Sequence, residues 1–251
     1  MINMVKKYEK PKLTHFFIIL CIIIYAAELF LKYSYGEDLF NSILFEYGFS
    51  FQNILMGRFW VLLTSIFLHA TPEHLVLNLI ALYFFGKVVE QEIGRKKFLL
   101  AFFASSFIAD LFIIVSSLMG FSSMAATTVG ASAAIFGLMG ISMVTKPLEF
   151  IFYPYLIPIP LVLVAVIYTL YNVASFLLVL TGQVSSNVSY VSHIGGLISG
   201  LLLGFREERS KKGFIIILFI LFLLLTTPFI MLIFNILENF NYVNILTRLF
   251  R

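Results

Sequence analysis

The chain has 251 residues, of which 61% are hydrophobic and 12% are charged, and its formal net charge is +4 at pH 7. Its apolar runs are too long for an ordinary soluble domain, which is therefore excluded. Because the basic residues are scattered over short segments, the positive charge does not indicate a nucleic-acid-binding surface, and we expect no nucleic-acid partner.

Seven apolar segments predict seven membrane-spanning helices. About 20 apolar residues in helical form cross the hydrocarbon layer, where a helix satisfies its own backbone hydrogen bonds. The longest runs lie at 13–31, 98–119, 155–181 and 214–237, and weaker ones lie at 61–85, 129–145 and 190–205. The sequence therefore predicts an all-α membrane protein. We expect a segment 1–12, a six-helix core 13–205, and a region 206–251 with a basic linker, the seventh helix and a short tail.

The basic residues predict the orientation of these helices. If the N-terminus is cytoplasmic, 13 of the 17 Lys and Arg residues fall on the cytoplasmic side, as the positive-inside rule requires. They are Lys6, Lys7, Lys10, Lys12, Lys87, Arg95, Lys96, Lys97, Lys146, Arg206, Arg209, Lys211 and Lys212. We therefore expect a multi-pass protein of the cell membrane with its C-terminus outside.

The connection after the first span, 32–60, is the longest polar one and is rich in aromatic residues. We expect it to lie on or in the outer membrane face, as an interfacial aromatic belt would. The first span itself holds Cys21, the only cysteine, which excludes an internal disulfide and a cysteine-rich metal site.

The second helix begins with a capping pattern, in which Thr71 suits the N-cap and Pro72 the first helical position. His74 and Asn78 follow at a spacing of four, which places them on one helix face. Two uncharged hydrogen-bond donors at the outer end of a span suit an oxyanion hole. A hydrogen bond that only packs helices together is an equally good interpretation of this pair alone.

We expect different roles for two acidic residues, Asp110 and Glu90. Asp110 is the only acid near the middle of the third span, and we expect a structural polar contact or a protonated side chain there. Glu90 falls at the cytoplasmic boundary, where we expect it to brace the loop.

The fourth span opens with the segment TTVGASAAIFGLMG, whose central serine is Ser132. A serine in a membrane helix usually forms a hydrogen bond to the preceding turn or lets helices approach closely, so Ser132 alone is weak support for a nucleophile. The glycines that flank it let another helix come near, and Gly130 leaves room around the hydroxyl.

In the sixth span, glycines recur every four residues after His193, which lies close to the same face. A buried imidazole needs partners for both ring nitrogens, and Ser132 is the obvious one.

Together these residues supply the parts for acyl transfer. Ser132 would be the nucleophile, His193 the general base and acid, and His74 with Asn78 the oxyanion stabilisers. No acidic third member stands at a suitable place, so the sequence predicts a dyad rather than a triad.

At this point the chain resembles the rhomboid family of intramembrane serine proteases. The resemblance covers roughly 13–205 and rests on three motifs in order, "FLHATPEHLVLNL", "GASAAIFG" and "SHIGG" followed by "LISG". It implies a six-helix core, a Ser132–His193 dyad, and substrates that are transmembrane helices of other membrane proteins, with no cofactor or metal. Departures are Ala133 after the serine, Phe136 in place of a tyrosine, and Trp60 followed by Val61 rather than arginine.

Alternative functions remain open from the sequence. A rhomboid-like membrane protein without catalysis could bind or escort transmembrane helices on the same scaffold. A small-solute transporter fits less well, because the polar residues lie toward one membrane face and no inverted repeat is visible. Zinc proteases would need a motif such as HExxH, and aspartyl types would need a second intramembrane aspartate. The seventh helix lacks buried ionisable residues, so we expect it to be dispensable for chemistry.

Overall fold

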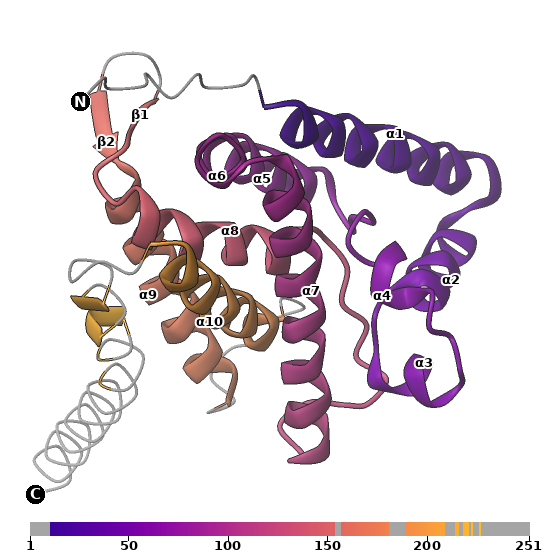
Figure 1. Cartoon of the computed structure of the whole chain (residues 1–251). Coiled ribbons are helices and arrows are strands. Elements are labelled where there is room, and N and C mark those ends of the chain that lie inside the picture. Colours follow the sequence, from indigo (N-terminus) through magenta and orange to yellow (C-terminus); the bar gives the residue numbers. More distant parts are fainter. Residues whose placement is uncertain are drawn as a thin grey trace, which may run out of the picture.

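The computed structural model describes residues 11–153, 157–180 and 189–208, and isolated positions between 214 and 226. This part of the chain is mainly helical, as predicted (Figure 1). Most of the seventh predicted span, 214–237, lies outside the described residues. The helices are α1 (Lys12–Tyr35), α2 (Glu37–Tyr47), α3 (Phe51–Leu55), α4 (Val61–Thr64), α5 (Pro72–Ala81), η1 (Leu82–Gly86), α6 (Lys87–Ile93), α7 (Arg95–Leu118), α8 (Ser132–Thr145), α9 (Leu161–Leu180) and α10 (Tyr190–Glu207). The strands are β1 (Phe150–Tyr153) and β2 (Ile157–Pro160).

Four helical stretches of the described residues are long and apolar enough to cross a membrane. They are Lys12–Tyr35, Pro72–Ile93, Arg95–Leu118 and Leu161–Val179. The chain is thus an integral membrane protein, and α8 is a shorter apolar helix among these spans.

Two predicted spans have the wrong boundaries. The second span runs over 72–93 rather than 61–85, because the chain stops its first helical turn before Thr71 and starts anew at Pro72. The span predicted at 155–181 begins only at Leu161, since the apolar residues before it form an antiparallel hairpin of β1 and β2. An apolar run shows that a segment avoids water, but the prolines in this one oppose a helix.

The start of α5 confirms the capping prediction. The Thr71 hydroxyl accepts a hydrogen bond from the backbone N–H of His74 at 3.2 Å, and Pro72 occupies the first turn. The helix continues through the π-helical turn η1 into α6. There Gly86 lets the start of α1 approach, because a Cβ on it would lie 3.0 Å from the Thr14 side chain.

Figure 1 shows α2, α3 and α4 gathered beside the end of α1, away from the β hairpin. Helices α2 and α3 lie within the predicted loop 32–60, which is therefore largely helical, and α4 follows it. Asn53 fastens this loop: it is fully buried, and its side-chain amide donates to the carbonyl oxygens of Phe45 (2.7 Å) and Gly48 (3.0 Å).

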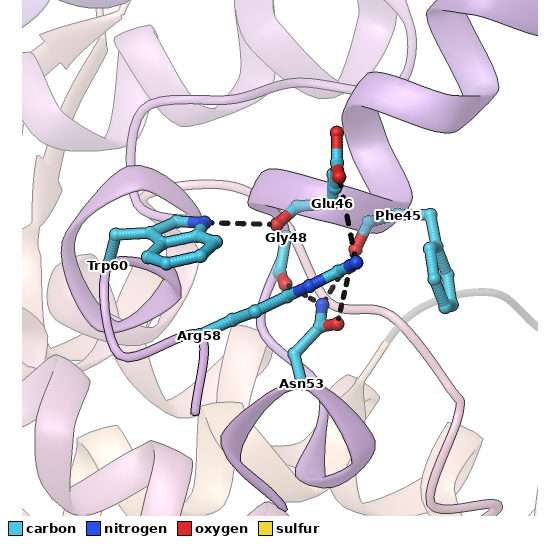
Figure 2. Close-up of polar contacts among 6 residues, drawn as sticks. All are labelled: Phe45, Glu46, Gly48, Asn53, Arg58 and Trp60. Carbon is cyan, nitrogen blue, oxygen red and sulfur yellow. Dashed lines mark hydrogen bonds and ion pairs between the residues drawn. The ribbon is translucent and has the colours of Figure 1, made fainter. Parts of the chain in front are cut away.

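Arg58 and Trp60 complete the fastening (Figure 2). The Arg58 guanidinium donates to Asn53 Oδ1 at 3.3 Å and lies 3.6 Å from the Glu46 carboxylate, while the Trp60 indole N–H donates to the Glu46 carbonyl at 3.2 Å. Arg58, two residues before Trp60, therefore holds the loop together, although Trp60 is followed by Val61 and not by an arginine. Because the ion pair is partly exposed, the buried amide contributes more to this anchoring.

Charged residues gather at the other end of the helix bundle, which we call the basic end. The Glu90 carboxylate accepts hydrogen bonds from the N–H groups of Leu13 (2.9 Å) and Thr14 (2.8 Å) and from the Thr14 hydroxyl (2.7 Å). It thus caps the first turn of α1, whose N–H groups have no acceptor within the helix. Glu90 therefore braces α1 as well as the neighbouring loop. Ion pairs join the remaining helix ends here: Arg95 with Glu90, Lys146 with Glu92, and Lys97 with Glu207.

Helix α8 is the centre of the bundle, and every residue from Ala133 to Val144 is buried. Glycines let α10 pack directly on its backbone. A Cβ on Gly200 would lie 1.9 Å from the Gly137 carbonyl oxygen, and one on Gly196 would lie 2.1 Å from that of Ala133. This close crossing fixes the start of α10 beside the start of α8, which positions the site described next.

Candidate active site

The depth of Ser132 follows from the length of α8. The helix has 14 residues, which at about 1.5 Å per residue gives roughly 21 Å. The hydrocarbon layer is about 30 Å thick, so a helix that ends at the basic end of the bundle begins well inside that layer. Ser132 is its first residue, and the backbone N–H groups of a first helical turn have no acceptor within the helix. The serine thus lies below the membrane surface at the positive end of a helix dipole.

The loop before Ser132 reaches this depth without charged residues, as the sequence indicates. Its backbone pairs with protein instead of lipid. Phe49 and Thr128 form an antiparallel bridge, with N–H···O distances of 2.9 and 2.7 Å, and the Gly130 N–H donates to the Ser65 carbonyl at 2.8 Å. Irregular backbone is tolerated at membrane depth when it is satisfied in this way.

His193 lies in the first turn of α10 and contacts Ser132. The distance from its Nε2 atom to Ser132 Oγ is 2.7 Å. The imidazole also stacks on the Phe136 ring, with centroids 4.4 Å apart and planes 10° from parallel. Phe136 stands one helical turn after Ser132, so α8 supplies both the hydroxyl and the apolar surface against which the imidazole rests.

The other imidazole nitrogen contacts Asn172, a residue that we did not predict from the sequence. Asn172 belongs to α9, and its Oδ1 atom lies 2.6 Å from His193 Nδ1. Its Nδ2 atom donates to the carbonyl oxygen of Tyr190 at 3.0 Å, and its exposed fraction is only 3%. The sequence signal was an amide inside an otherwise apolar span, but nothing in the sequence indicated its partner.

His74 and Asn78 face the same site from α5. A Cβ on Gly130 would lie 2.7 Å from the His74 Nε2 atom and 3.7 Å from the Asn78 Nδ2 atom. Gly130 precedes Ser132 by two residues and has φ +113, a conformation that favours glycine. Asn78 is buried and gives one of its two amide hydrogens to the His74 carbonyl at 2.8 Å. The structure therefore brings Ser132, His193, His74 and Asn78 into one site.

Asp110 is not among the residues that contact Ser132 or His193 in the described part of the chain. It lies on α7 with an exposed fraction of 5%, and its Oδ2 atom has no hydrogen-bond partner among the described residues. Those residues also include no group of three or more His, Cys, Asp or Glu side chains placed to hold a metal ion.

Comparisons with known proteins identify relatives of this chain. The family described as "Rhomboid domain" matches residues 56–210, more than half of the sequence. The Bacillus subtilis rhomboid protein YdcA is 32% identical over 158 residues, which is 62% of this chain and 71% of YdcA. The rhomboid protease GluP of B. subtilis is 29% identical over 205 residues, 81% of this chain but 36% of GluP. The rhomboid protease AarA of Providencia stuartii is 34% identical over 173 residues, 65% of this chain and 60% of AarA.

Proposed function

The chain belongs to the rhomboid family, and we propose that it is a serine-type intramembrane endopeptidase that hydrolyses peptide bonds in or next to transmembrane helices of other membrane proteins. Relatives named as proteases support the hydrolase activity. The observation that supports the serine mechanism most directly is the 2.7 Å contact between Ser132 Oγ and His193 Nε2.

Ser132 and His193 would divide the chemistry between them. As Ser132 Oγ attacks the carbonyl carbon, its proton passes to His193 Nε2, because a serine hydroxyl is a poor nucleophile until a base removes that proton. Collapse of the tetrahedral intermediate breaks the C–N bond, and the imidazolium returns the proton to the leaving amine. Water then attacks the acyl-enzyme by the same route and restores the Ser132 hydroxyl.

The oxyanion would form next to Gly130. The backbone N–H of Ser132, the His74 imidazole and the second amide hydrogen of Asn78 are the donors available around that position. Donors that are fixed before the reaction begins stabilise a developing charge without further reorganisation.

The substrate class follows from the surroundings of the site. Ser132 lies inside the membrane region, so a peptide bond must reach it from a neighbouring membrane protein, and the segment around that bond must leave its helical form to expose the carbonyl. The family resemblance adds a preference for helices that unwind readily and for a small residue before the cleaved bond.

The orientation proposed from the basic residues places the site near the outer membrane face, with the N-terminus in the cytoplasm. The gathering of Lys97, Lys146 and Arg95 at the basic end supports this proposal. In a Cys21→Ser background, a membrane-impermeant maleimide applied to intact cells should label Asp38→Cys and leave Glu208→Cys unlabelled. The reverse pattern would overturn the orientation.

Cleavage in proteoliposomes tests the proposed activity. The full chain is reconstituted with a single-span protein whose helix contains a glycine- and alanine-rich break. The wild type should cleave it, and Ser132→Ala should not. Ser142→Ala is the matched control, because Ser142 is a buried serine of the same helix whose hydroxyl bonds to the Met139 carbonyl at 2.8 Å. Equal cleavage by the wild type and Ser132→Ala would leave the non-catalytic helix binder as the better explanation.

A further inference from the structure

Helix α9 contains one buried amide side chain, Asn172, whose hydrogen bonds go to another helix. The face of α9 turned to the bundle is formed by Leu161, Ala165, Thr169 and Asn172, at the spacing of a helix stripe. Thr169 donates to the Ala165 carbonyl of its own helix at 2.8 Å. Asn172 instead makes both of its hydrogen bonds to α10, one to His193 and one to the Tyr190 carbonyl. A polar side chain at this depth is costly unless it is fully bonded, so these two contacts need a functional or structural explanation.

The contact with Tyr190 determines which way the amide points. A carbonyl oxygen can only accept, so the atom of Asn172 that faces it at 3.0 Å must be the NH2 group. The atom that faces His193 Nδ1 at 2.6 Å is then the carbonyl oxygen, which also only accepts. His193 must therefore carry a proton on Nδ1. In the neutral ring this leaves Nε2 as the acceptor, directed at the Ser132 hydroxyl.

We propose that Asn172 is a positioning residue that holds the His193 imidazole in the Nδ1-protonated tautomer and in the ring orientation needed to accept the Ser132 proton. This inference rests on the proposed serine mechanism and extends the predicted dyad by a third, neutral member. The Phe136 ring fixes the plane of the imidazole, and Asn172 fixes its rotation within that plane. When Nε2 takes the proton, the Nδ1–H bond to Asn172 remains and stabilises the imidazolium.

A neutral amide suits this place better than a carboxylate. An ionised aspartate beside the Tyr190 carbonyl would be a buried charge next to a partial negative charge, which costs free energy in a medium of low dielectric constant. Asparagine keeps the acceptor for Nδ1–H and adds a donor for the carbonyl, so no charge is buried before the reaction begins.

The rate of covalent labelling by a fluorophosphonate separates positioning from folding. In this reaction Ser132 Oγ forms a bond to phosphorus, fluoride leaves, and the serine proton passes to His193. The reconstituted full chain is labelled at several probe concentrations, which gives a maximal rate and a half-saturating concentration. Asn172→Leu, which is similar in size but has no acceptor, should lower the maximal rate about 10- to 100-fold and change the half-saturating concentration little.

Two further variants complete the experiment. Asn172→Asp should recover most of the lost rate, because a protonated carboxyl can both accept from Nδ1–H and donate to the Tyr190 carbonyl. Thr169→Val removes another buried polar group from the same helix face and should label at the wild-type rate. If Asn172→Leu does not fold, Asn172→Ser, whose hydroxyl is too short to reach Nδ1, takes its place and should show the same loss.

Three results would overturn the inference. The first is a wild-type maximal rate in folded Asn172→Leu or Asn172→Ser. The second is an equal loss in Thr169→Val, and the third is the absence of any recovery in Asn172→Asp. Failure of the proposed function would look different, since the wild type itself would then show no labelling that depends on Ser132.

Discussion

Gly130 lies between Ser132 on α8 and the proposed oxyanion donors His74 and Asn78 on α5. Its positive φ turns the chain into α8, and its missing side chain admits the His74 ring from α5. A side chain at this position would occupy the space in which the oxyanion is proposed to form. The geometry of this one residue thus connects the nucleophile to its stabilising donors.

We predict that Gly130→Ala lowers the cleavage rate about 100-fold, because displacing an oxyanion donor costs a factor of 10² to 10³. The new Cβ would lie 2.7 Å from the His74 ring, so the ring would have to move. The rate is measured in proteoliposomes, together with the thermal unfolding temperature.

Gly120→Ala is the control for this prediction. Gly120 also has a positive φ, +79, but a Cβ there meets nothing within 4 Å. Both variants place an alanine at a positive φ, which strains the backbone, and only Gly130→Ala also places a Cβ against His74. Equal rates in the two variants would contradict the role assigned to this position.

Among single residues, the sequence indicated as site candidates those whose side-chain chemistry is unusual for a membrane helix. Ser132, His193, His74 and Asn78 could be named in advance as candidates, because hydroxyls, imidazoles and amides stand out in an apolar span. Asn172 could not be assigned, because its partner lies 21 positions away on another helix and its role depends on the direction of one amide. Such a pairing is set by how α9 packs on α10, which no local pattern encodes.

The crossing of α8 and α10 is the element that holds the catalytic distance. Their backbones approach through Gly137, Gly196 and Gly200, so any added side chain must push the two helices apart. Ser132 and His193 stand at the same end of these helices and would be separated by that movement.

We predict that Gly200→Ala reduces both stability and labelling. A Cβ 1.9 Å from the Gly137 carbonyl oxygen requires a shift of more than 1 Å to reach ordinary contact. Overpacking of this kind costs about 1–3 kcal/mol, and a misplacement near 1 Å costs about 100-fold in rate. Leu202→Ala, on the same helix but 63% exposed, should leave the labelling rate unchanged. Unimpaired labelling of Gly200→Ala would show that the crossing does not set the distance.

The helices and strands show which features an apolar sequence pattern can predict and which it cannot. The start of α5 could be placed to the residue, because Thr71 and Pro72 are local signals with a known geometry. The hairpin of β1 and β2 and the helices α2 and α3 were missed, because an apolar or aromatic run indicates the environment of a segment and not its backbone conformation. The extension of the second span to Ile93 was missed because it depends on packing around η1 and on Glu90 holding α1.

For the whole molecule, the ion pairs of the basic end and the proposed site lie at opposite ends of the bundle. Glu90, Lys97 and Lys146 belong to contacts that fasten the helices at the basic end. The opposite end holds the loop anchored by Asn53 and the partly exposed site. This division fits an enzyme that must be rigid at one membrane face and accessible at the other.

The predicted seventh helix remains a prediction, because it falls largely outside the described residues. All residues of the proposed site belong to α5, α8, α9 and α10. Glu207, whose ion pair with Lys97 joins helix ends at the basic end, also lies before the seventh predicted span. We therefore expect a chain that ends after Glu208 to fold and to cleave the proteoliposome substrate as the full chain does. A truncated chain with the unfolding temperature of the full chain but no cleavage would assign the seventh helix a part in the chemistry.

The identity of the residue that reacts with a fluorophosphonate tests the central claim most directly. The full chain is labelled in its membrane, digested, and analysed by mass spectrometry. We predict a single adduct on Ser132 that is absent from Ser132→Ala and from His193→Ala. No adduct, an adduct on another residue, or undiminished labelling of His193→Ala would contradict a serine nucleophile activated by His193.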